Sequence, residues 1–542
     1  MSQRQQQIQQ IDDTTFDVFI IGGGINGAVA AAALSGRGAK VALVDRGDFA
    51  GFTSSASSNL VWGGFKYLEN YEFKLVRDLC VARNRMIDAY PTQIEPIGFL
   101  AALDRSSPYP PLLAGLGTVG YWMIGSFKTR PPALLSPKKI KAMEPVIDID
   151  NVRGGIRYDD AYLRDNDARF VFGFVGNALN RGANAANYVS VERAERIDGL
   201  WRMHLCDTET GKRFIADAKV VINAAGPFVD GLNTDMGFTT DHKVAYSKGI
   251  HLVVPRIGSQ DRVLAFFDDT QRLFYVIPME DRSVLGTTDT RTDDAHDGVT
   301  DEDRRFVLEQ INARLDLQSP LTEADIISER VGVRPLVVES DFGDTEGIDW
   351  TSLSRKHEIE HDDHAKVISV FGGKLTDCIN VGEELLELVS HLGIDISPEV
   401  DDGWFGEPSE SERDAFMSAA AEFDLGDDRC GCPMAATLWR RYGRRAHQVL
   451  ENIRRDPSLA VPTLNCSDHL GAELPVIAET EMVVHLEDFL RRRSKLAMVE
   501  RRDTIADDPG FTRLAEGLFG ADAAERINEY QISMKATAEN RR

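Results

Sequence analysis

Cysteine and positive charge are both scarce in this sequence. Six cysteines in 542 residues are too few for a disulfide scaffold, and they fit a cytoplasmic chain that keeps its thiols reduced. The 61 lysines and arginines stand against 86 aspartates and glutamates, which gives a net charge of −25. A field of this sign repels nucleic acid, so a general nucleic-acid-binding protein is excluded. An anionic substrate must therefore be met by a local cluster of cations.

Long apolar runs and metal-ligand spacings are also missing. No stretch offers 18 clean apolar residues, so we expect no membrane-spanning helix. The N-terminus is polar and rich in glutamine, without the apolar core of a secretory signal, and we expect a disordered tail over 1–14. Cys430 and Cys432 form the only close cysteine pair, and no second pair completes a zinc site. We therefore predict no metal site.

The most apolar segment spans 110–127 and contains Tyr121 and Trp122. Five cations follow it, at Lys128, Arg130, Lys138, Lys139 and Lys141. An apolar segment flanked by cations suits docking on an anionic membrane surface without spanning it. A buried loop and helix with a solvated rim is the alternative interpretation.

Near the N-terminus the pattern predicts a βαβ unit. A buried strand over 16–21 runs into Gly22-x-Gly24-x-x-Gly27, a small-sided helix follows, and a second strand ends at Asp45. Gly22 permits the tight turn, Gly24 lets the backbone approach a pyrophosphate, and Gly27 allows close helix–sheet packing. The phosphates would lie at the helix N-terminus, and Asp45 would accept a ribose hydroxyl.

This fingerprint alone does not separate FAD from NAD. A run of hydroxyl residues at 53–58 and small-residue turns at 223–227 and 372–376 add backbone approaches that are far apart in sequence. Several distant approaches suit an extended ligand such as FAD. Strands predicted at 201–205 and 273–278 alternate as in a second, more antiparallel sheet, and the pattern becomes helical beyond Gly403.

Seven ordered segments resemble the FAD-dependent, quinone-linked glycerol-3-phosphate dehydrogenases, a family that this chain would join as a divergent member. They are IGGGINGA at 21–28, TSSASS at 53–58, YLENYEF at 67–73, KGIH at 248–251, GTTD at 286–289, GVRPL at 332–336 and FGGKLT at 371–376. The likeness covers about residues 16–500. It continues in RYG at 441–443 and LEDFLRRR at 486–493.

The resemblance implies a Rossmann-like FAD-binding domain, an antiparallel-sheet capping domain over the substrate, and a C-terminal helical domain. We expect the FAD-dependent region at 15–400, with FAD-binding segments at about 15–75, 150–230 and 330–395, capping segments at about 76–150 and 231–330, and the helical domain at 401–542. The expected cofactor-binding residues are Gly22, Gly24, Asn26, Gly27, Asp45, Ser54, Ser55, Ser57, Trp62, Gly63, Ala225, Gly226, Gly373, Leu375 and Thr376.

The resemblance also implies oxidation of sn-glycerol 3-phosphate to dihydroxyacetone phosphate, by hydride transfer to flavin N5, with electrons passed to membrane quinone. His251 matches the family's histidine and is the expected general base. Arg334 and Lys374 match its cationic positions and would act with His251, while Lys66 and Arg272 would join them in binding the phosphate. The implied location is the cytoplasm, peripheral on the inner face of the cell membrane, and a homo-oligomer stays open.

Several positions depart from the family pattern. Trp62 replaces a histidine, Lys66 replaces an arginine, and Asp377-Cys378-Ile379 stands where the family usually has Tyr-Arg one residue on. These departures keep open a flavin dehydrogenase or oxidase acting on another phosphorylated or carboxylated 2-hydroxy compound. A non-enzymatic flavin-binding scaffold is a third hypothesis, and it does not explain why a base and cations are kept together.

Overall fold

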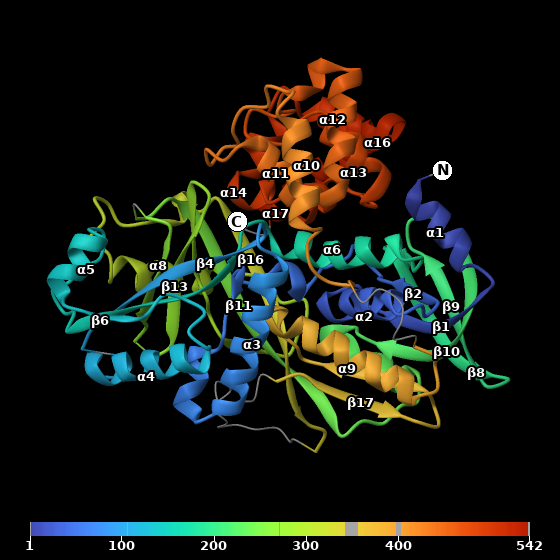
Figure 1. Cartoon of the computed structure of the whole chain (residues 1–542), viewed down its shortest axis with the longest axis horizontal. Coiled ribbons are helices and arrows are strands. Elements are labelled where there is room, and N and C mark those ends of the chain that lie inside the picture. Colours follow the sequence, from blue (N-terminus) through green and yellow to red (C-terminus); the bar gives the residue numbers. More distant parts are fainter. Residues whose placement is uncertain are drawn as a thin grey trace.

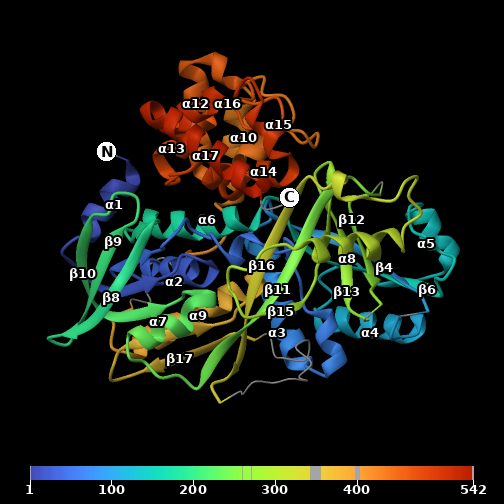
Figure 2. The same ribbon diagram turned by 180° about the vertical axis from the view of Figure 1, so that it is seen from behind.

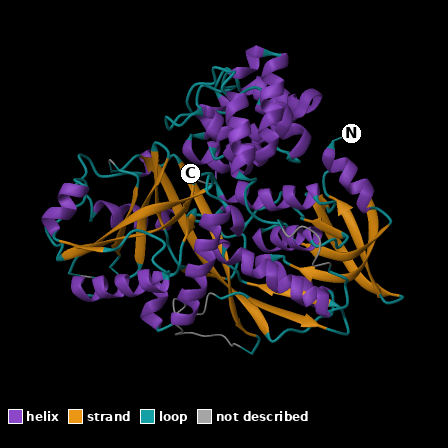
Figure 3. Ribbon diagram, viewed as in Figure 1, coloured by secondary structure: helices purple, strands orange, loops and turns teal. Residues whose placement is uncertain are grey.

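The chain folds into two large sheets with their helices and a separate helical C-terminal part (Figure 1). The computed structural model describes residues 2–105, 107–258, 260–269, 271–341, 356–396 and 403–539. Figure 3 shows that the C-terminal part contains helices and loops and lies against the junction of the two sheets. No helix among the described residues has the length and apolar character needed to cross a bilayer.

The first sheet carries the predicted βαβ unit. Its order is β17-β18-β10-β1-β2-β7, parallel except at β17, and the hairpin β8–β9 extends it antiparallel through β10. The strands are β1 (Thr14–Ile21), β2 (Val41–Val44), β7 (Asn184–Ala186), β8 (Val189–Ile197), β9 (Leu200–Asp207), β10 (Arg213–Asn223), β17 (Glu358–Asp362) and β18 (Val367–Phe371).

Alternate residues of β1 pack to opposite sides of this sheet. Val18 and Ile20 join a core with three helices: α2 (Ile25–Gly36), α6 (Asp167–Asn180) and α9 (Cys378–His391). Phe19 and Ile21 pack on the other side, where α1 (Gln3–Ile11) and the β8–β9 hairpin cover them. Both faces are therefore dry, as the unbroken apolar runs predict for a parallel sheet.

Two predictions about this region are wrong. The N-terminus is not a disordered tail, because α1 has a Ser2–Gln5 capping box and buries Ile8 and Ile11. The strand predicted at 201–205 does not join the second sheet. It is part of β9, which pairs with β10 of the first sheet, because alternation identifies a strand but not its partner.

The second sheet is larger and mostly antiparallel. Its order is β15-β11-β14-β13-β12-β4-β6-β3, with β16 paired to β11 and β5 to β6. The strands are β3 (Leu60–Val61), β4 (Ile94–Leu103), β5 (Ala133–Leu135), β6 (Gly154–Leu163), β11 (His242–Pro255), β12 (Arg262–Phe267), β13 (Leu273–Met279), β14 (Arg282–Gly286), β15 (Thr290–Thr292) and β16 (Ser328–Glu339). β3, β6 and β16 lie in this sheet although the predicted FAD-binding segments cover all or most of each.

Helices surround both sheets. Those of the sheet regions are α3 (Phe73–Ala89), α4 (Pro111–Ile124), α5 (Pro137–Met143), α7 (Val229–Asp235) and α8 (Asp301–Asn312). Four short 3₁₀ segments matter for the site, and they are η1 (Thr53–Ser55), η2 (Phe65–Asn70), η3 (Gly226–Phe228) and η6 (Leu375–Asp377). Figure 2 shows β11 and β16 side by side between the two halves of the molecule.

The C-terminal part has its own apolar core. Its helices are α10 (Glu410–Ala420), α11 (Met434–Tyr442), α12 (Ala446–Arg455), α13 (Glu473–Thr480), a π-helix (Asp488–Arg493), α14 (Leu496–Val499), α15 (Arg502–Ala506), α16 (Phe511–Phe519) and α17 (Ala523–Glu539). The predicted boundary at 400 falls outside the described residues.

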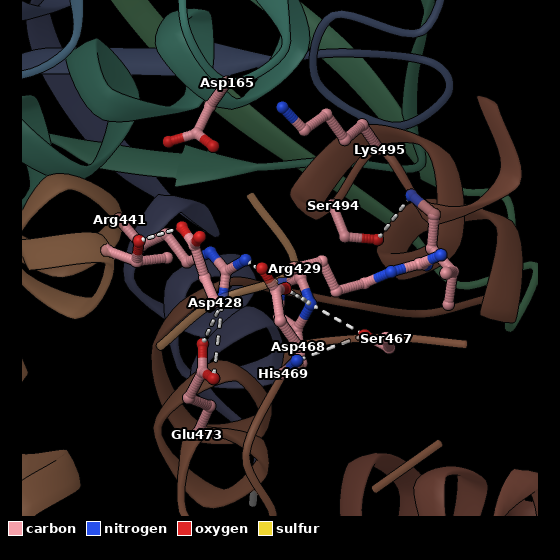
Figure 4. Close-up of polar contacts among 12 residues, drawn as sticks. Asp165, Asp428, Arg429, Arg441, Ser467, Asp468, His469, Glu473, Ser494 and Lys495 are labelled. Carbon is pink, nitrogen blue, oxygen red and sulfur yellow. Dashed lines mark hydrogen bonds and ion pairs between the residues drawn. The ribbon is translucent and has the colours of Figure 1, made fainter. Parts of the chain in front are cut away.

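Buried ion pairs hold this part against the sheets. Arg440 pairs with Asp165 at 2.9 Å, and Arg493 pairs with Asp48 at 2.8 Å. Figure 4 shows Asp165 and Lys495 at the junction, near Arg441 with its partners Asp468 and Glu473. Removing one partner of such a pair would leave a buried charge without its counter-ion, so these pairs hold the helical part in one orientation.

Candidate active site

The glycine turn after β1 opens the N-terminus of α2 to a cleft. Gly22 has φ of +104°, and a Cβ there would lie 2.6 Å from the Ala224 carbonyl oxygen. A Cβ at Gly27 would lie only 1.8 Å from the Gly22 carbonyl oxygen. The backbone is packed too tightly for side chains at these positions, and Gly24, Ile25 and Asn26 at the N-terminus of α2 line the cleft, where a pyrophosphate would lie.

Asp45 lies at the end of β2, on the wall of the same cleft. Its Oδ2 accepts the Gly23 N–H at 2.6 Å and its Oδ1 accepts the Gly47 N–H at 2.8 Å. Burial raises the pKa of this carboxyl to about 6. Each carboxylate oxygen keeps a second lone pair, which can accept a ribose hydroxyl as the sequence predicts.

The cleft has a volume of about 470 Å³ and lies at the carboxyl ends of β1, β2 and β10. Eight of the predicted cofactor-binding residues line it: Gly22, Gly24, Asn26, Asp45, Ser54, Ala225, Gly226 and Gly373. A second cavity of about 350 Å³ shares Ile25, Ser54 and Gly373 with it. Because the two spaces share lining residues they adjoin, and together they offer the extended site that a long dinucleotide such as FAD needs.

Asn26 links two of the turns that were predicted to approach the cofactor. Its Nδ2 donates to the Gly372 carbonyl at 2.9 Å, and a Cβ at Gly373 would lie 2.8 Å from its Oδ1. That Oδ1 is buried and has no hydrogen-bond partner among the described residues. An unsatisfied buried acceptor at the cleft wall is a place for a ligand donor, which supports the fit of FAD.

The second cavity gathers almost every side chain that the sequence assigns to chemistry. Its lining includes Ser57, Trp62, Lys66, His251, Arg272, Arg334, Lys374, Leu375 and Thr376. Three predicted cofactor residues do not line either space. Gly27 is buried in the contact between α2 and the sheet, Ser55 faces a neighbouring cavity, and the Gly63 N–H donates to Asp160 at 3.2 Å.

His251 is almost fully buried in β11, and neither ring nitrogen has a hydrogen-bond partner among the described residues. Burial, reinforced by the positive charges of Arg330 and Arg334, lowers its pKa well below 6.5. The imidazole is therefore neutral at physiological pH and can accept a proton. Gly286 leaves room for the ring, since a Cβ there would lie 2.7 Å from its Cδ2.

Arg334 on β16 and Arg272 at the start of β13 meet at Asp289. Arg334 donates to Thr287 Oγ1 at 2.9 Å and lies 3.5 Å from Asp289 Oδ1, while Arg272 donates to the Asp289 carbonyl at 2.6 Å. Gly249 makes space for the Arg334 guanidinium, because a Cβ there would lie 2.1 Å from Nη2. Two guanidinium groups are thus fixed at one side of the cavity, where they suit a phosphate.

Lys374 enters the cavity from the loop after β18. Its Nζ lies 4.1 Å from the centre of the Tyr67 ring, a cation–π contact. The centre of the Trp62 ring lies 5.8 Å from that of the Tyr67 ring, and the backbone N–H of Trp62 donates to Thr376 Oγ1 at 3.2 Å. Trp62 and Lys66 therefore replace the family's histidine and arginine within the cavity itself.

Two other departures have a different place. Cys378 and Ile379 are fully buried in the first turn of α9 and do not line the cavity. Their effect is on packing, because both join the core of the first sheet.

Sequence reasoning assigned no role to several lining residues, including Tyr67, Tyr275, Thr287, Thr288 and Asp289. The signal was present for four of them, because YLENYEF and GTTD are among the segments that carry the resemblance. The sequence does not reveal that β11 pairs with β14, and it is this pairing that brings Gly286 beside His251.

Comparison with known proteins agrees with this geometry. Residues 17–353 match the FAD dependent oxidoreductase family, and residues 410–526 match the C-terminal domain of alpha-glycerophosphate oxidase. The aerobic glycerol-3-phosphate dehydrogenase of Bacillus subtilis (strain 168) is 33% identical over 71% of this chain and 69% of its own. The aerobic glycerol-3-phosphate dehydrogenase of Staphylococcus aureus (strain MRSA252) is 29% identical, over 90% of this chain and 88% of its own length.

A solved structure is similar over nearly the whole chain. The glycerol-3-phosphate dehydrogenase from Bacillus halodurans, complexed with FAD, has a TM-score of 0.72 and 25% identity, covering 99% of this chain and 97% of its own. The resemblance inferred from seven segments and the FAD cofactor are thereby confirmed. The chain belongs to the FAD-dependent oxidoreductases and, within them, to the aerobic glycerol-3-phosphate dehydrogenases.

Proposed function

We propose that this chain oxidises sn-glycerol 3-phosphate to dihydroxyacetone phosphate and passes the electrons to a quinone in the membrane. One observation carries the proposal. The cavity beside the FAD cleft contains a neutral, buried histidine and a group of cationic side chains that includes Arg272, Arg334 and Lys374. Related chains named for this activity support the choice of substrate.

Each group has one task in this reaction. Arg334 and Arg272 would hold the phosphate, which is remote from the reacting carbon, so its binding energy orients the substrate. His251 would take the proton of the C2 hydroxyl at a ring nitrogen. FAD, when bound, supplies the acceptor for the hydride from C2. Loss of that proton and that hydride leaves the carbonyl of dihydroxyacetone phosphate.

The local charge overcomes the field of the whole protein. The net charge is −25, yet this cavity is lined by five cations, Lys66, Arg272, Arg334, Lys356 and Lys374, against one carboxylate, Asp289. The cavity therefore attracts a phosphate although the net charge of the whole protein repels anions.

Anaerobic bleaching of the flavin absorbance tests this function. sn-Glycerol 3-phosphate should bleach the flavin at lower concentration than glycerol, which lacks the phosphate. Bleaching only by a different phosphorylated or carboxylated 2-hydroxy compound would contradict the substrate assignment. An absence of bleaching by any such alcohol would contradict an enzymatic role.

The quinone part of the proposal rests on helix α4. Its outer face exposes Leu112, Leu113, Leu116, Val119 and Met123, the first of them 67% exposed. Soluble surfaces seldom expose apolar side chains in such a contiguous group, and such patches mark sites of interaction. We assign this α4 face to docking on a lipid surface.

The α4 face is linked to the active cavity through η2. Phe65 packs on Tyr121 of α4 with ring centroids 5.5 Å apart, and the next two residues, Lys66 and Tyr67, line the cavity. Asp160 adds a second link, since it accepts from the Tyr121 hydroxyl at 2.7 Å and from the Gly63 N–H at 3.2 Å. Docking through α4 would bring the cavity close to the membrane that holds quinone.

Vesicle flotation tests the docking. Replacing Leu112, Leu116 and Met123 by serine should release the FAD-loaded protein from anionic vesicles, because each removes apolar area that lipid would bury, roughly 1 kcal/mol per side chain. A matched control replaces Val461 and Ile532, which are equally exposed on the C-terminal part. Equal flotation of the α4 variant and the control would refute the assignment.

A further inference from the structure

A histidine and carboxylate cluster lies at the edge of the first sheet, on the turn between β17 and β18. His361 is in β17, Asp363 is in the turn, and His391 is the last residue of α9. Among the described residues it is the only group of three histidine, cysteine or carboxylate side chains whose ligand atoms all lie within 4.8 Å of one another. Figure 1 shows α9 alongside β17.

The distances within this cluster match those of a metal centre. His391 Nε2 lies 3.3 Å from Asp363 Oδ1, and His361 Nε2 lies 3.6 Å from the same oxygen. Ligand atoms around a tetrahedral Zn²⁺ at bond lengths of about 2.0–2.2 Å are separated by about 3.3–3.6 Å. The two imidazole rings are nearly perpendicular, with an interplanar angle of 83°, so they meet edge to face and do not stack.

The turn is built so that Asp363 can serve as a ligand. The neighbouring Asp362 uses its Oδ1 to accept the N–H groups of His364 and Ala365, at 2.8 and 2.7 Å, and thereby fixes the turn. The carboxylate of Asp363 is 63% exposed and turns to the two histidines. An exposed cluster leaves a coordination position for water and a path for the ion.

The ligand set selects the kind of ion. Imidazole with one carboxylate suits Zn²⁺ and its transition-metal neighbours, whereas Ca²⁺ and Mg²⁺ prefer oxygen-only sites.

We propose that His361, Asp363 and His391 form a site for a divalent transition-metal ion of the Zn²⁺ class. The ion would join the β17–β18 turn to the end of α9. Between those two points the chain passes through β18, the loop with Lys374, and the start of α9. The metal would therefore close a structural ring around the segment that carries a cavity cation, and its role would be to stabilise this segment.

Calorimetric titration of the tag-free, FAD-loaded chain with ZnCl₂ tests the site. One Zn²⁺ should bind per chain, and His391→Ala or Asp363→Asn should weaken binding more than about 10-fold because each removes a direct ligand. His364→Ala is the matched control, since this exposed histidine is in the same turn but outside the cluster. It should bind Zn²⁺ like the unmodified chain. The absence of binding in the unmodified chain, or unchanged affinity in both ligand variants, would overturn the proposal.

Two further measurements separate ligation from a change in folding. Electron paramagnetic resonance of the Cu²⁺-loaded chain should show hyperfine coupling to two imidazole nitrogens, and to one in His361→Ala. Zn²⁺ at about 100 times its dissociation constant should raise the Tm by about 3 °C or more, since it binds the folded chain. An equal rise in His391→Ala, or nitrogen coupling that is unchanged in His361→Ala, would contradict the assignment.

Discussion

The cleft at the end of the first sheet and the cavity under the second sheet are built in different ways. The cleft is shaped by backbone, with Gly22 and Gly373 at positions of positive φ where a side chain would be strained and crowded. The cavity is shaped by side chains, among them His251 and Arg334 from adjacent strands. The cleft requires glycines, which leave space for a ligand, whereas the cavity requires particular charged and titratable side chains.

Strand register explains why the second site is harder to specify. In the β11–β16 ladder Ser247 stands opposite Arg334, and His251 stands opposite Arg330. Lys248, one residue from Ser247, points to the other face and pairs with Asp303 at 2.9 Å. Because neighbouring residues alternate between faces, a slip of one residue would replace the cavity's base with a core side chain.

The largest effect is expected from a substitution that disrupts the glycine turn at the FAD cleft. Gly27→Ala places a Cβ 1.8 Å from the Gly22 carbonyl, so α2 must move away from β1 and the pyrophosphate turn is lost. We expect a colourless chain with FAD affinity reduced by more than about 100-fold, or no folded chain. Gly173→Ala is the control, because a Cβ at that helical position meets nothing within 4 Å. Its FAD content should equal that of the unmodified protein, and a yellow, stable Gly27→Ala chain would contradict the argument.

The next effect concerns the side-chain site alone. His251→Gln removes the base and retains a polar side chain, so we expect kcat to fall by about 10²- to 10⁴-fold while the flavin spectrum is unchanged. Stopped-flow reduction of the flavin measures the chemical step. A loss of less than 10-fold would show that another group takes the proton.

The pH dependence of kcat/KM provides a second test of the role of His251. The pKa of His251 is lowered, so the neutral base is populated at pH 6.5 and is protonated only well below it. The acid limb of kcat/KM should therefore lie below pH 6.5 and disappear in His251→Gln. An acid limb near pH 7 that persists in the variant would belong to a different group.

The difference between the two regions also explains what the sequence predicts well. The strand–turn–helix around Gly22 is local, and its parts lie within 30 residues, so periodicity and glycine spacing suffice to place it. His251, Arg334 and Lys374 were found through the matched segments and not through periodicity, because they lie far apart along the chain.

The errors have the same origin. The N-terminal helix is rich in glutamine, and the tertiary contacts that stabilise it are remote, since Arg4 Nε donates to the Asn187 carbonyl at 2.9 Å. β9 was recognised as a strand but given to the other sheet, because its partner β10 could not be read from alternation. The proposed metal site is a different case, because it joins Asp363 to His391 across a helix and no ligand spacing in the sequence indicates it, and the absence of a metal site stays a prediction.

A third prediction tests the geometry of the phosphate cup. Arg334→Lys keeps the charge but loses the forked donor that contacts Thr287 and faces Asp289. We expect kcat/KM to fall about 30- to 150-fold, a loss of about 2–3 kcal/mol, mainly through KM. Arg256→Lys, outside the cavity, should change neither constant by more than twofold. Equal effects of the two substitutions would remove Arg334 from substrate binding.

A fourth prediction concerns a buried histidine next to the loop that carries Lys374. His357 is buried between Asp377 at 2.7 Å and Glu384 at 2.9 Å, and it holds the start of α9 just after the Lys374 loop. Burial lowers its pKa, but the two carboxylates outweigh this and raise it to about 9. A raised pKa contributes stability that is fully present below pH 6.5 and is lost as the pH rises through about 9.

Replacing this histidine should therefore cost stability in a pH-dependent way. His357→Gln should lower the free energy of unfolding by roughly 2 kcal/mol at pH 6, and by little at pH 10. Denaturant unfolding at both pH values measures the difference. A gap that is the same at pH 6 and pH 10 would show that packing, and not the charge, makes the contribution.

The smallest effect concerns a departure from the family within the cavity. Lys66 lines the cavity where relatives usually carry arginine, and an ammonium cannot form the forked contact of a guanidinium. Lys66→Arg should therefore lower the KM for sn-glycerol 3-phosphate by about two- to fivefold with kcat unchanged, a gain of at most about 1 kcal/mol. Lys66→Met should raise KM, which separates the role of charge from that of the fork. If Lys66→Arg leaves KM unchanged or raises it, this chain binds its phosphate without a contribution from Lys66, and the side-chain site has diverged from the family while the glycine turn of the cleft has not.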